Sequence, residues 1–246
     1  MKRMTYGGFR TIVAGDRTGA MLEKVRAALR RSVDRAYDFN RFFKTPIRAY
    51  GVRYPVLRKL AESSYPENVD PADLARICDK LWQSGMHEES VVAIAWAKKG
   101  GIASIPLMKR WLHNYVGNWA QVDDLCLSVL CPLLEKDASW LAEIKRWAGS
   151  KNLWTRRASA VALVTPCRKG LYLQDCLEVA TRLLLDNEDL VQKAYGWALR
   201  EAGKKHPNEI FRFILKHKDV MGRTALRYAI ELMPASMKRR AMRRST

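Results

Sequence analysis

The residues best suited to chemistry lie at the starts of predicted helices. Trp119 and Asp123 are four residues apart, and Trp154 and Arg157 are three apart. Residues at these spacings share one face of a helix. The chain carries a formal net charge of +19, so a carboxylate beside an indole and among cations suggests chemistry on a polyanion. Phosphate binding alone would not call for the carboxylate.

The first of these helices has a well-marked start. Asn118 is a good N-cap, and Gln121 three residues later resembles a capping box. Asp123 then falls beside Trp119 at the edge of the apolar stripe, whereas Asp124 is turned about 100° further toward solvent. The alternative is purely structural, because the helix dipole favours Asp near an N-terminus and Trp often simply packs there.

A third segment again places a Trp on one helix face, here among cations. In the helix predicted near 189–205, Lys193, Trp197, Arg200 and Lys204 fall on one face. An aromatic ring among cations can touch sugar or base while the cations neutralise phosphates. The planar guanidinium of Arg157 also suits phosphate, because it can donate two parallel hydrogen bonds. The alternative is a solvated face with the Trp side chains buried between helices.

Composition narrows the class of protein. The chain has 246 residues, of which 48% are hydrophobic and 28% charged, as expected of a globular protein. The strong basic excess favours DNA, RNA or an anionic membrane surface as partner. No phosphate-loop, zinc-protease, dinucleotide or G-x-S-x-G motif is present, and the four His are scattered. We therefore predict neither a metal nor a cofactor.

Cysteine usage and hydropathy bear on the compartment. Five Cys form no C-x-x-C pair and lie mostly in apolar stretches, which favours a reducing compartment without a disulfide framework. The N-terminus has no apolar signal core, and the longest apolar run, 91–97, is too short to span a membrane. We expect a soluble, cytoplasmic protein of bacterial type, associated with the nucleoid through DNA.

The periodicity is helical almost throughout, with no convincing alternating strand pattern. Helices are predicted near 18–33, 34–44, 55–64, 71–84, 87–99, 104–115, 119–134, 138–148, 153–165, 172–186, 189–205, 207–218 and 222–233. They form pairs whose second helices begin alike at intervals of about 32 to 37 residues, which is typical of helical-hairpin repeats. We predict an all-α fold of helical-hairpin repeats, stacked as a curved α-solenoid with a concave basic face. A conventional helical bundle is the alternative.

We predict one helical-repeat domain over residues 1–236 and a basic tail over 237–246. From Lys204 onward there are twelve Lys or Arg against three Asp or Glu. The last stretch, 237–244, is expected to be mobile. A solvated end without a specific role remains the alternative.

The chain resembles the AlkD family of DNA alkylation-repair glycosylases from about Phe42 to Leu232, and the resemblance implies that its repeats are HEAT-like. The resemblance rests on several short stretches in the same order as in the family: Phe42-Phe43-Lys44-Thr45, Gly51-Val52-Arg53-Tyr54-Pro55-Val56-Leu57-Arg58-Lys59-Leu60, Asn118-Trp119 with Asp123, Trp154 with Arg157, and Gln192-Lys193-Ala194-Tyr195-Gly196-Trp197-Ala198-Leu199-Arg200-Glu201. The last stretch is long and specific. At 120–121 the chain has Ala-Gln, where the family often has an acidic residue.

The resemblance implies roles for individual residues. Asp123 would be the catalytic carboxylate, and Trp119 and Trp197 would contact the deoxyribose of the damaged nucleotide. Arg157 would hold a nearby phosphate, and Phe42 would occupy the place of an aromatic contact that is Tyr in some members. The remaining predicted DNA contacts are Lys44, Trp154, Lys193 and Arg200.

The implied reaction is hydrolysis of the N-glycosidic bond of a cationic N3- or N7-alkylpurine in duplex DNA, bulky adducts included. The alkylated base leaves neutral, so little acid catalysis is needed, and the carboxylate stabilises positive charge on the sugar. We expect a monomer with no obligate protein partner. Two rivals are a non-catalytic HEAT-like protein that binds branched or distorted DNA, and a HEAT-like protein scaffold.

Overall fold

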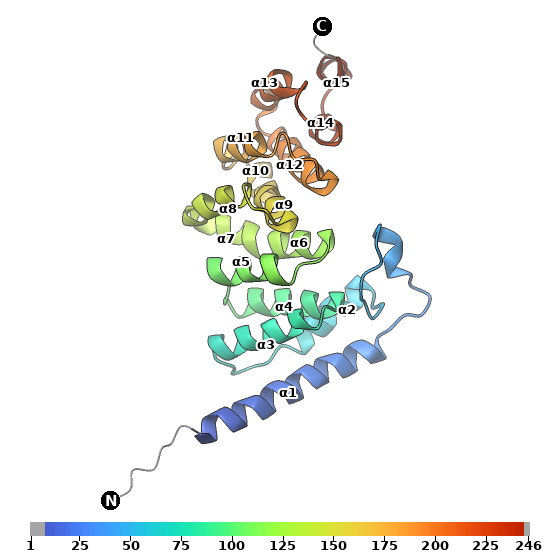
Figure 1. Cartoon of the computed structure of the whole chain (residues 1–246), viewed down its shortest axis with the longest axis vertical. Coiled ribbons are helices and arrows are strands. Elements are labelled where there is room, and N and C mark those ends of the chain that lie inside the picture. Colours follow the sequence, from blue (N-terminus) through green and yellow to red (C-terminus); the bar gives the residue numbers. More distant parts are fainter. Residues whose placement is uncertain (1–7, 244–246) are drawn as a thin grey trace, which may run out of the picture. The chain divides into compact units, whose positions relative to one another are not determined.

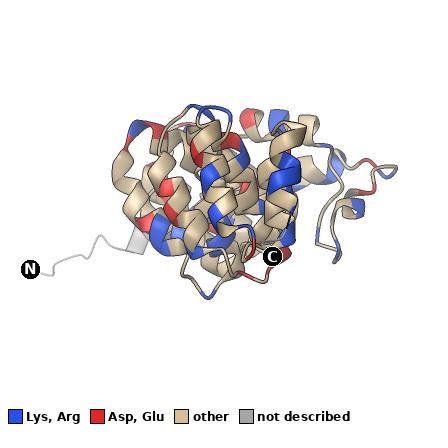
Figure 2. Ribbon diagram, turned by 90° about the horizontal axis from the view of Figure 1, so that it is seen from above, with Lys and Arg blue, Asp and Glu red and all other residues tan. Residues whose placement is uncertain are grey.

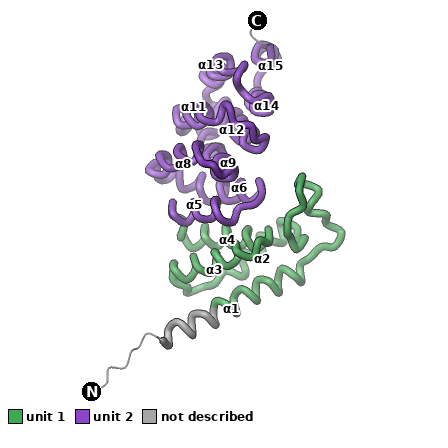
Figure 3. The backbone as a smooth tube through the Cα atoms, viewed as in Figure 1, with its two compact units in different colours: residues 1–103 green, residues 104–246 purple. Residues whose placement is uncertain are grey.

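The computed structural model describes residues 8–243, with side chains from residue 18 onward. It is built from helices, and no strand occurs within that range. The chain divides into two compact units, residues 1–103 and residues 104–246 (Figure 3). The Trp-rich helices singled out in the sequence all belong to the second unit.

Unit 1 is built on four α-helices and one 3₁₀ turn (Figure 1). These are α1 (Gly8–Arg31), η1 (Phe39–Phe42), α2 (Tyr54–Ser63), α3 (Pro71–Gln83) and α4 (His87–Lys99). The start of α3 shows how the sequence sets a boundary. The carboxylate of Asp70 accepts hydrogen bonds from the backbone of Ala72 and Asp73, and Pro71 opens the first turn, where no N–H donor is required. Helix α4 packs against both α2 and α3.

The predicted helix at 34–44 is wrong. This stretch belongs to an ordered loop, 32–53, that contains only the 3₁₀ turn. Tertiary hydrogen bonds outweigh the local helical pattern. The buried carboxylate of Glu88 accepts from the backbone N–H groups of Tyr50, Gly51 and Val52 at 2.7–3.1 Å, and Gly51 adopts a positive φ of 89° that other residues rarely tolerate.

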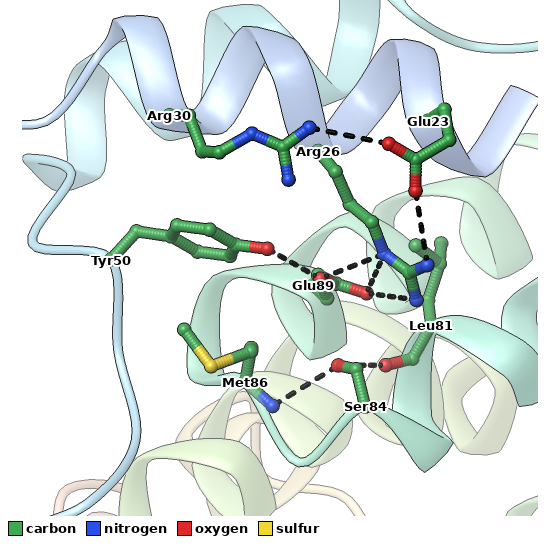
Figure 4. Close-up of polar contacts among 8 residues, drawn as sticks. All are labelled: Glu23, Arg26, Arg30, Tyr50, Leu81, Ser84, Met86 and Glu89. Atoms are coloured by element: carbon green, nitrogen blue, oxygen red, sulfur yellow. Dashed lines mark hydrogen bonds and ion pairs between the residues drawn. The ribbon is translucent and has the colours of Figure 1, made fainter.

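A second buried carboxylate ties the loop to α1. Glu89 is 1% exposed, and its oxygens accept from the guanidinium of Arg26 at 3.2–3.3 Å and from the hydroxyl of Tyr50 at 2.7 Å (Figure 4). Burial and this hydrogen bond raise the pKa of Tyr50 to about 12. A buried charge is tolerated only with such partners, so the cluster fixes α1 and the loop against α4.

Unit 2 consists of stacked helical pairs followed by one further helix (Figure 1). Its elements are α5 (Ile105–Asn114), α6 (Trp119–Leu125), η2 (Cys126–Leu130), α7 (Cys131–Lys136), η3 (Ala138–Trp140), α8 (Leu141–Trp147), α9 (Leu153–Val161), α10 (Val164–Arg168), α11 (Leu173–Arg182), α12 (Asp189–Ala202), α13 (Pro207–His217), α14 (Arg223–Ile230) and α15 (Ala235–Met242). The second helices α6, α9, α12 and α14 pack in succession, and the first helices α5, α8, α11 and α13 lie beside them.

In unit 2, ion pairs connect each helical repeat to the next. Five of them join residues 33 or 34 positions apart, which is one structural repeat: Lys109–Glu143, Lys145–Glu178, Arg157–Asp123, Arg168–Glu201 and Lys169–Glu135, with N···O distances of 2.5–3.2 Å. A regular period in the sequence therefore becomes a regular ladder of charges in the structure.

The predicted helix at 119–134 is helical throughout, but its middle is unusual. Residues Cys126–Leu130 form a π-helical turn between α6 and α7, and the N–H of Cys131 bonds to the carbonyl of Cys126. Pro132 explains the turn, because it has no N–H for the carbonyl of Ser128 and its ring crowds that oxygen. Pro166, 34 residues later, lies where α9 gives way to α10.

The structure confirms the all-α class and the stacked helical repeats. The five Cys are all buried, as their apolar surroundings indicated. No described helix combines the length and apolar character that a membrane crossing requires. The single domain over 1–236, the overall curvature and the concave basic face stay predictions. The segment expected to be a mobile tail is different in the structure, since α15 runs through Met242 and buries Ala241; residues 244–246 lie outside the described part.

Candidate active site

The start of α6 fixes the orientation of the candidate carboxylate. The side chain of Asn118 accepts a hydrogen bond from the N–H of Gln121 at 3.0 Å, as its N-cap position predicts. The Gln121 side chain in turn accepts from the N–H of Gly117 at 2.9 Å. Asn118 and Gln121 are both buried. This cap sets the first turn, and Asp123 follows Trp119 by one turn on the same face.

Asp123 is held by a two-pronged contact with Arg157 of α9. Its Oδ1 accepts from Nε at 3.0 Å and its Oδ2 from Nη2 at 2.8 Å. The Asp123 side chain is 16% exposed and that of Arg157 only 6%. The fork geometry fixes the plane of the carboxylate, and the remaining exposure leaves part of Asp123 open to solvent. The structure thus brings together two residues that the sequence places 34 positions apart.

The third nitrogen of Arg157 is also engaged. Nη1 donates to the backbone carbonyl of Leu190 in the first turn of α12. All three guanidinium nitrogens of Arg157 therefore donate hydrogen bonds to groups of the protein, and these contacts position Asp123. The phosphate contact predicted for Arg157 stays a prediction, because a phosphate would have to share nitrogens that these groups already occupy.

The neighbouring Arg156 secures the turn before α12. Its Nε donates to the carboxylate of Asp186 at 2.6 Å and its Nη1 donates to the carbonyls of Ser150 and Lys151 at 3.0 Å. The Asp186 backbone carbonyl accepts from the side chain of Gln192 at 2.9 Å. No local sequence pattern indicated this role for Asp186. Asp186 thus fixes the segment that leads into α12. The first turn of α12 carries the Leu190 carbonyl, so this also fixes the position of Arg157.

Electrostatics separate Asp123 from three other carboxylates of the ladder. Cationic partners hold the pKa values of Glu143, Glu178 and Glu201 below their ordinary range even though burial opposes them. For Asp123, burial outweighs the charge and hydrogen bonds of Arg157, and its pKa is raised. Perturbed carboxyls of this kind are concentrated at functional sites.

The three Trp residues predicted to be functional lie on the second helices of unit 2. Trp119 on α6, Trp154 on α9 and Trp197 on α12 are each half-buried. The indole N–H of Trp197 is buried and has no hydrogen-bond partner among the described residues. Such a group is costly unless the site compensates for it. Each of the three side chains is thus partly exposed, and the helix that carries it is packed in the row α6, α9 and α12.

The predicted cations of α12 are already paired. Nζ of Lys193 forms an ion pair at 2.8 Å with the carboxylate of Asp189, which lies one turn earlier on α12. Arg200 contacts Glu201 at 3.1 Å and also pairs with Glu231. Both side chains remain partly exposed, at 34% and 21%. Their predicted contacts with DNA stay predictions, and would require exchange of a carboxylate for a phosphate.

Phe42 and Lys44 belong to unit 1, on the loop 32–53. Phe42 is 49% exposed, and the guanidinium of Arg41 lies 4.6 Å from its ring centroid. Lys44 is exposed as well. Neighbouring Phe43 packs toward the ring of the buried His87. Two Phe side by side in sequence therefore have different environments, and Phe42 is the one displayed to solvent.

Comparison with known proteins agrees with this architecture. The chain matches the model of a family described as DNA alkylation repair enzyme over residues 25–233. No curated protein matches it. A predicted DNA alkylation repair enzyme from Enterococcus faecalis has a similar fold, with a TM-score of 0.64, 18% identity and coverage of 88% of this chain and 96% of that one. The described residues contain no group of three or more His, Cys, Asp or Glu that could hold a metal ion. With most of its length matched, the chain belongs to the DNA alkylation repair enzyme family.

Proposed function

We propose that this protein is a DNA glycosylase that removes cationic N3- or N7-alkylpurines from duplex DNA and leaves an abasic site. Membership of a DNA alkylation repair family supports the repair role and DNA as partner. The observation that carries the finer proposal is the Asp123 carboxylate, which is partly open to solvent and locked in orientation by Arg157, and whose pKa is raised by burial.

The chemistry of the substrate matches a site with a fixed carboxylate. Alkylation at N3 or N7 gives the purine a positive charge, so the base departs neutral when the glycosidic bond breaks. Positive charge then develops on the deoxyribose, and a preorganised anion stabilises it without reorganising. The same carboxylate can orient or deprotonate the attacking water. The faces of Trp119 and Trp197 can add attraction to a cationic sugar.

Arg157 contributes through Asp123. A carboxylate that is mostly buried would otherwise tend to take up a proton, and the guanidinium favours the ionised form while fixing its plane. The carboxylate is thereby held in a defined orientation.

The proposal is tested by measuring release of free base from methylated duplex DNA. The wild-type protein is expected to release 7-methylguanine or 3-methyladenine faster than spontaneous depurination, with abasic sites formed in equal number. Duplexes with bulky N7 adducts extend the same assay. Tight binding to duplex or branched DNA without release of any alkylated base would overturn the proposal in favour of a non-catalytic DNA-binding protein.

The pH dependence of excision follows from the raised pKa of Asp123. Only the ionised carboxylate stabilises the cationic sugar, so excision is expected to fall as the pH drops through this pKa. The acid limb should therefore have its midpoint above 3.8, the ordinary value for Asp. Replacing Arg157 by Gln removes the charge that lowers the pKa, so the midpoint should move to still higher pH.

The measurement is the single-turnover rate between about pH 4 and pH 8, corrected for spontaneous depurination at each pH. An acid limb that stays in place in the Arg157→Gln variant would show that the limb does not report Asp123. Arg168→Gln, which breaks another inter-repeat pair, is the matched control and should leave the limb where it is.

A further inference from the structure

The last helix of the described chain lies beyond the residues that match the family. The match ends at 233, and α15 spans Ala235–Met242. It is docked on unit 2, where it packs against α13 and α14 and buries Ala241. The guanidinium of Arg240 lies 5.1 Å from the ring centroid of Phe211. Helix α15 is thus a fixed part of unit 2 that the family model does not cover.

The end of α15 is also tied to its neighbours. Lys218 donates from Nζ to the backbone carbonyl of Arg243 at 2.5 Å, and Nη2 of Arg223 lies 3.7 Å from Sδ of Met242. The latter contact brings the start of α14 next to the last turn of α15. Since Lys238 and Arg239 precede Met242 by four and three residues, they lie on the same side of α15 as that contact.

These helices present a cluster of cations that we name the α14–α15 basic face: Arg223, Arg227, Lys238 and Arg239. Three of the four are exposed and Lys238 is half-buried. Figure 2, which views the chain from above, shows the blue segments on helices near the C-terminal label. Among the described residues, no ion pair joins a member of this face to a carboxylate.

Nearby carboxylates are already used elsewhere. Asp189 on α12 pairs with Lys193 and accepts from the hydroxyl of Thr224, and Glu231 pairs with Arg200. The contrast with the ladder is clear, because there each cation meets a carboxylate one repeat away. The α14–α15 basic face instead leaves its positive charge uncompensated.

The fold gives only a partial reason for these charges. The helix dipole favours cations in a last turn, which suits Arg239 on α15. It disfavours Arg223, the first residue of α14, where the N–H groups already carry partial positive charge. Arg223 and Arg227 are moreover four residues apart on one helix, a spacing at which like charges repel. An external anion would remove both penalties.

We propose that the α14–α15 basic face binds phosphates of duplex DNA outside the segment that carries the lesion. The face adjoins the row of second helices, because α14 packs along α12, which carries Trp197. Its cations stand on docked helices, so binding requires less ordering than it would for a mobile tail. An anionic membrane is a poorer match, since the apolar residues of α15 include the buried Ala241 and the half-buried Met237 and Met242, whereas a membrane-surface helix exposes its apolar side.

The proposal rests on DNA being the partner and not on the excision reaction. Affinity for an undamaged duplex is measured over a range of salt concentrations for the full chain and for the variant Arg227→Gln/Lys238→Gln/Arg239→Gln. Arg223 is kept because it contacts Met242. Each lost phosphate contact should reduce the slope of log affinity against log salt by about 0.9. The expected reduction is about two to three, with tenfold or greater loss of affinity near 0.1 M salt.

The matched control is Lys136→Gln/Lys205→Gln/Lys216→Gln, which removes three exposed cations located elsewhere in unit 2. It has the same net charge as the test variant, so any difference between them reports the basic face itself. Thermal unfolding of both variants checks that α15 remains folded. The same proteins are also titrated with vesicles containing anionic lipid.

Equal salt slopes for the test and control variants would overturn the proposal. Loss of vesicle binding with unchanged DNA binding would overturn it in favour of a membrane surface. A protein that excises no alkylated base would still give an interpretable salt slope, so failure of the glycosylase proposal and failure of this one are distinguishable.

Discussion

Replacing Asp123 by Asn is expected to slow excision of alkylpurines by about three orders of magnitude. The two side chains have nearly the same shape, but Asn carries no charge to stabilise the sugar cation. At about 4 Å and an effective dielectric constant near 20, that interaction is of order 4 kcal/mol, which corresponds to roughly a thousandfold in rate. The measurement is single-turnover release of 7-methylguanine from methylated duplex DNA.

The same substitution also costs stability, and this must be separated from catalysis. Asn cannot neutralise Arg157, whose side chain is 6% exposed. Removing one partner of a buried pair costs about 3–5 kcal/mol, because the other charge remains. Excision must therefore be compared at a temperature well below the unfolding midpoint of the variant, with folding verified by thermal denaturation.

Glu143→Gln is the matched control for that loss. Glu143 is buried on α8, in the row of first helices, and pairs with Lys109 and Arg146. Its substitution removes a ladder carboxylate but leaves Asp123 and Arg157 untouched. We expect a lower unfolding midpoint and nearly unchanged excision. If Asp123→Asn excised as fast as Glu143→Gln, the carboxylate would have no catalytic role.

Replacing Gly196 by Ala is expected to disrupt the contact between α12 and α14. A Cβ at this position would lie 2.6 Å from the carbonyl oxygen of Ala225 and 2.7 Å from Cβ of Tyr228. A backbone carbonyl in a helix cannot rotate away, so the helices must separate. Overpacking of this kind costs about 1–3 kcal/mol, which exceeds the gain of about 1 kcal/mol from the higher helix propensity of Ala.

The separation of α12 from α14 is expected to disturb the candidate active site. Helix α12 carries Trp197 directly after Gly196 and also supplies the Leu190 carbonyl to Arg157. We expect the midpoint of thermal unfolding to fall by several degrees, on the basis of about 2–4 °C per kcal/mol for a protein of this size. Excision should fall more than in the Glu143→Gln control, because the substitution displaces α12 and also weakens its packing against α14.

Gly203→Ala tests whether the effect is specific to the crossing. Gly203 follows α12 directly, has a right-handed helical conformation, and a Cβ there would meet its neighbours at 3.4–3.7 Å. This is ordinary contact, so the change in stability should stay within about 0.5 kcal/mol or be slightly favourable. Equal destabilisation by the two substitutions would show that the close approach at Gly196 is not what constrains α12.

The sequence by itself determined the class of fold and the location of the candidate chemistry. Helical periodicity, caps such as Asn118 and breakers such as Pro71 act within a few residues, so they can be recognised locally. The recurrence of similar helix starts at about one repeat predicted the stacked pairs of unit 2. The spacing of Trp119 and Asp123 on one face is likewise a local property, and the structure retains it.

Only the tertiary structure decided how these residues are used. The phosphate contact of Arg157 stays a prediction, but it was packing of α6, α9 and α12 that placed its guanidinium against Asp123 and the Leu190 carbonyl. The loop 32–53 lost its predicted helix to the buried Glu88, and the predicted mobile tail became a docked helix. In each case the deciding partner lies more than twenty residues away. Local patterns do not encode such distant contacts, because they depend on which surfaces folding brings together.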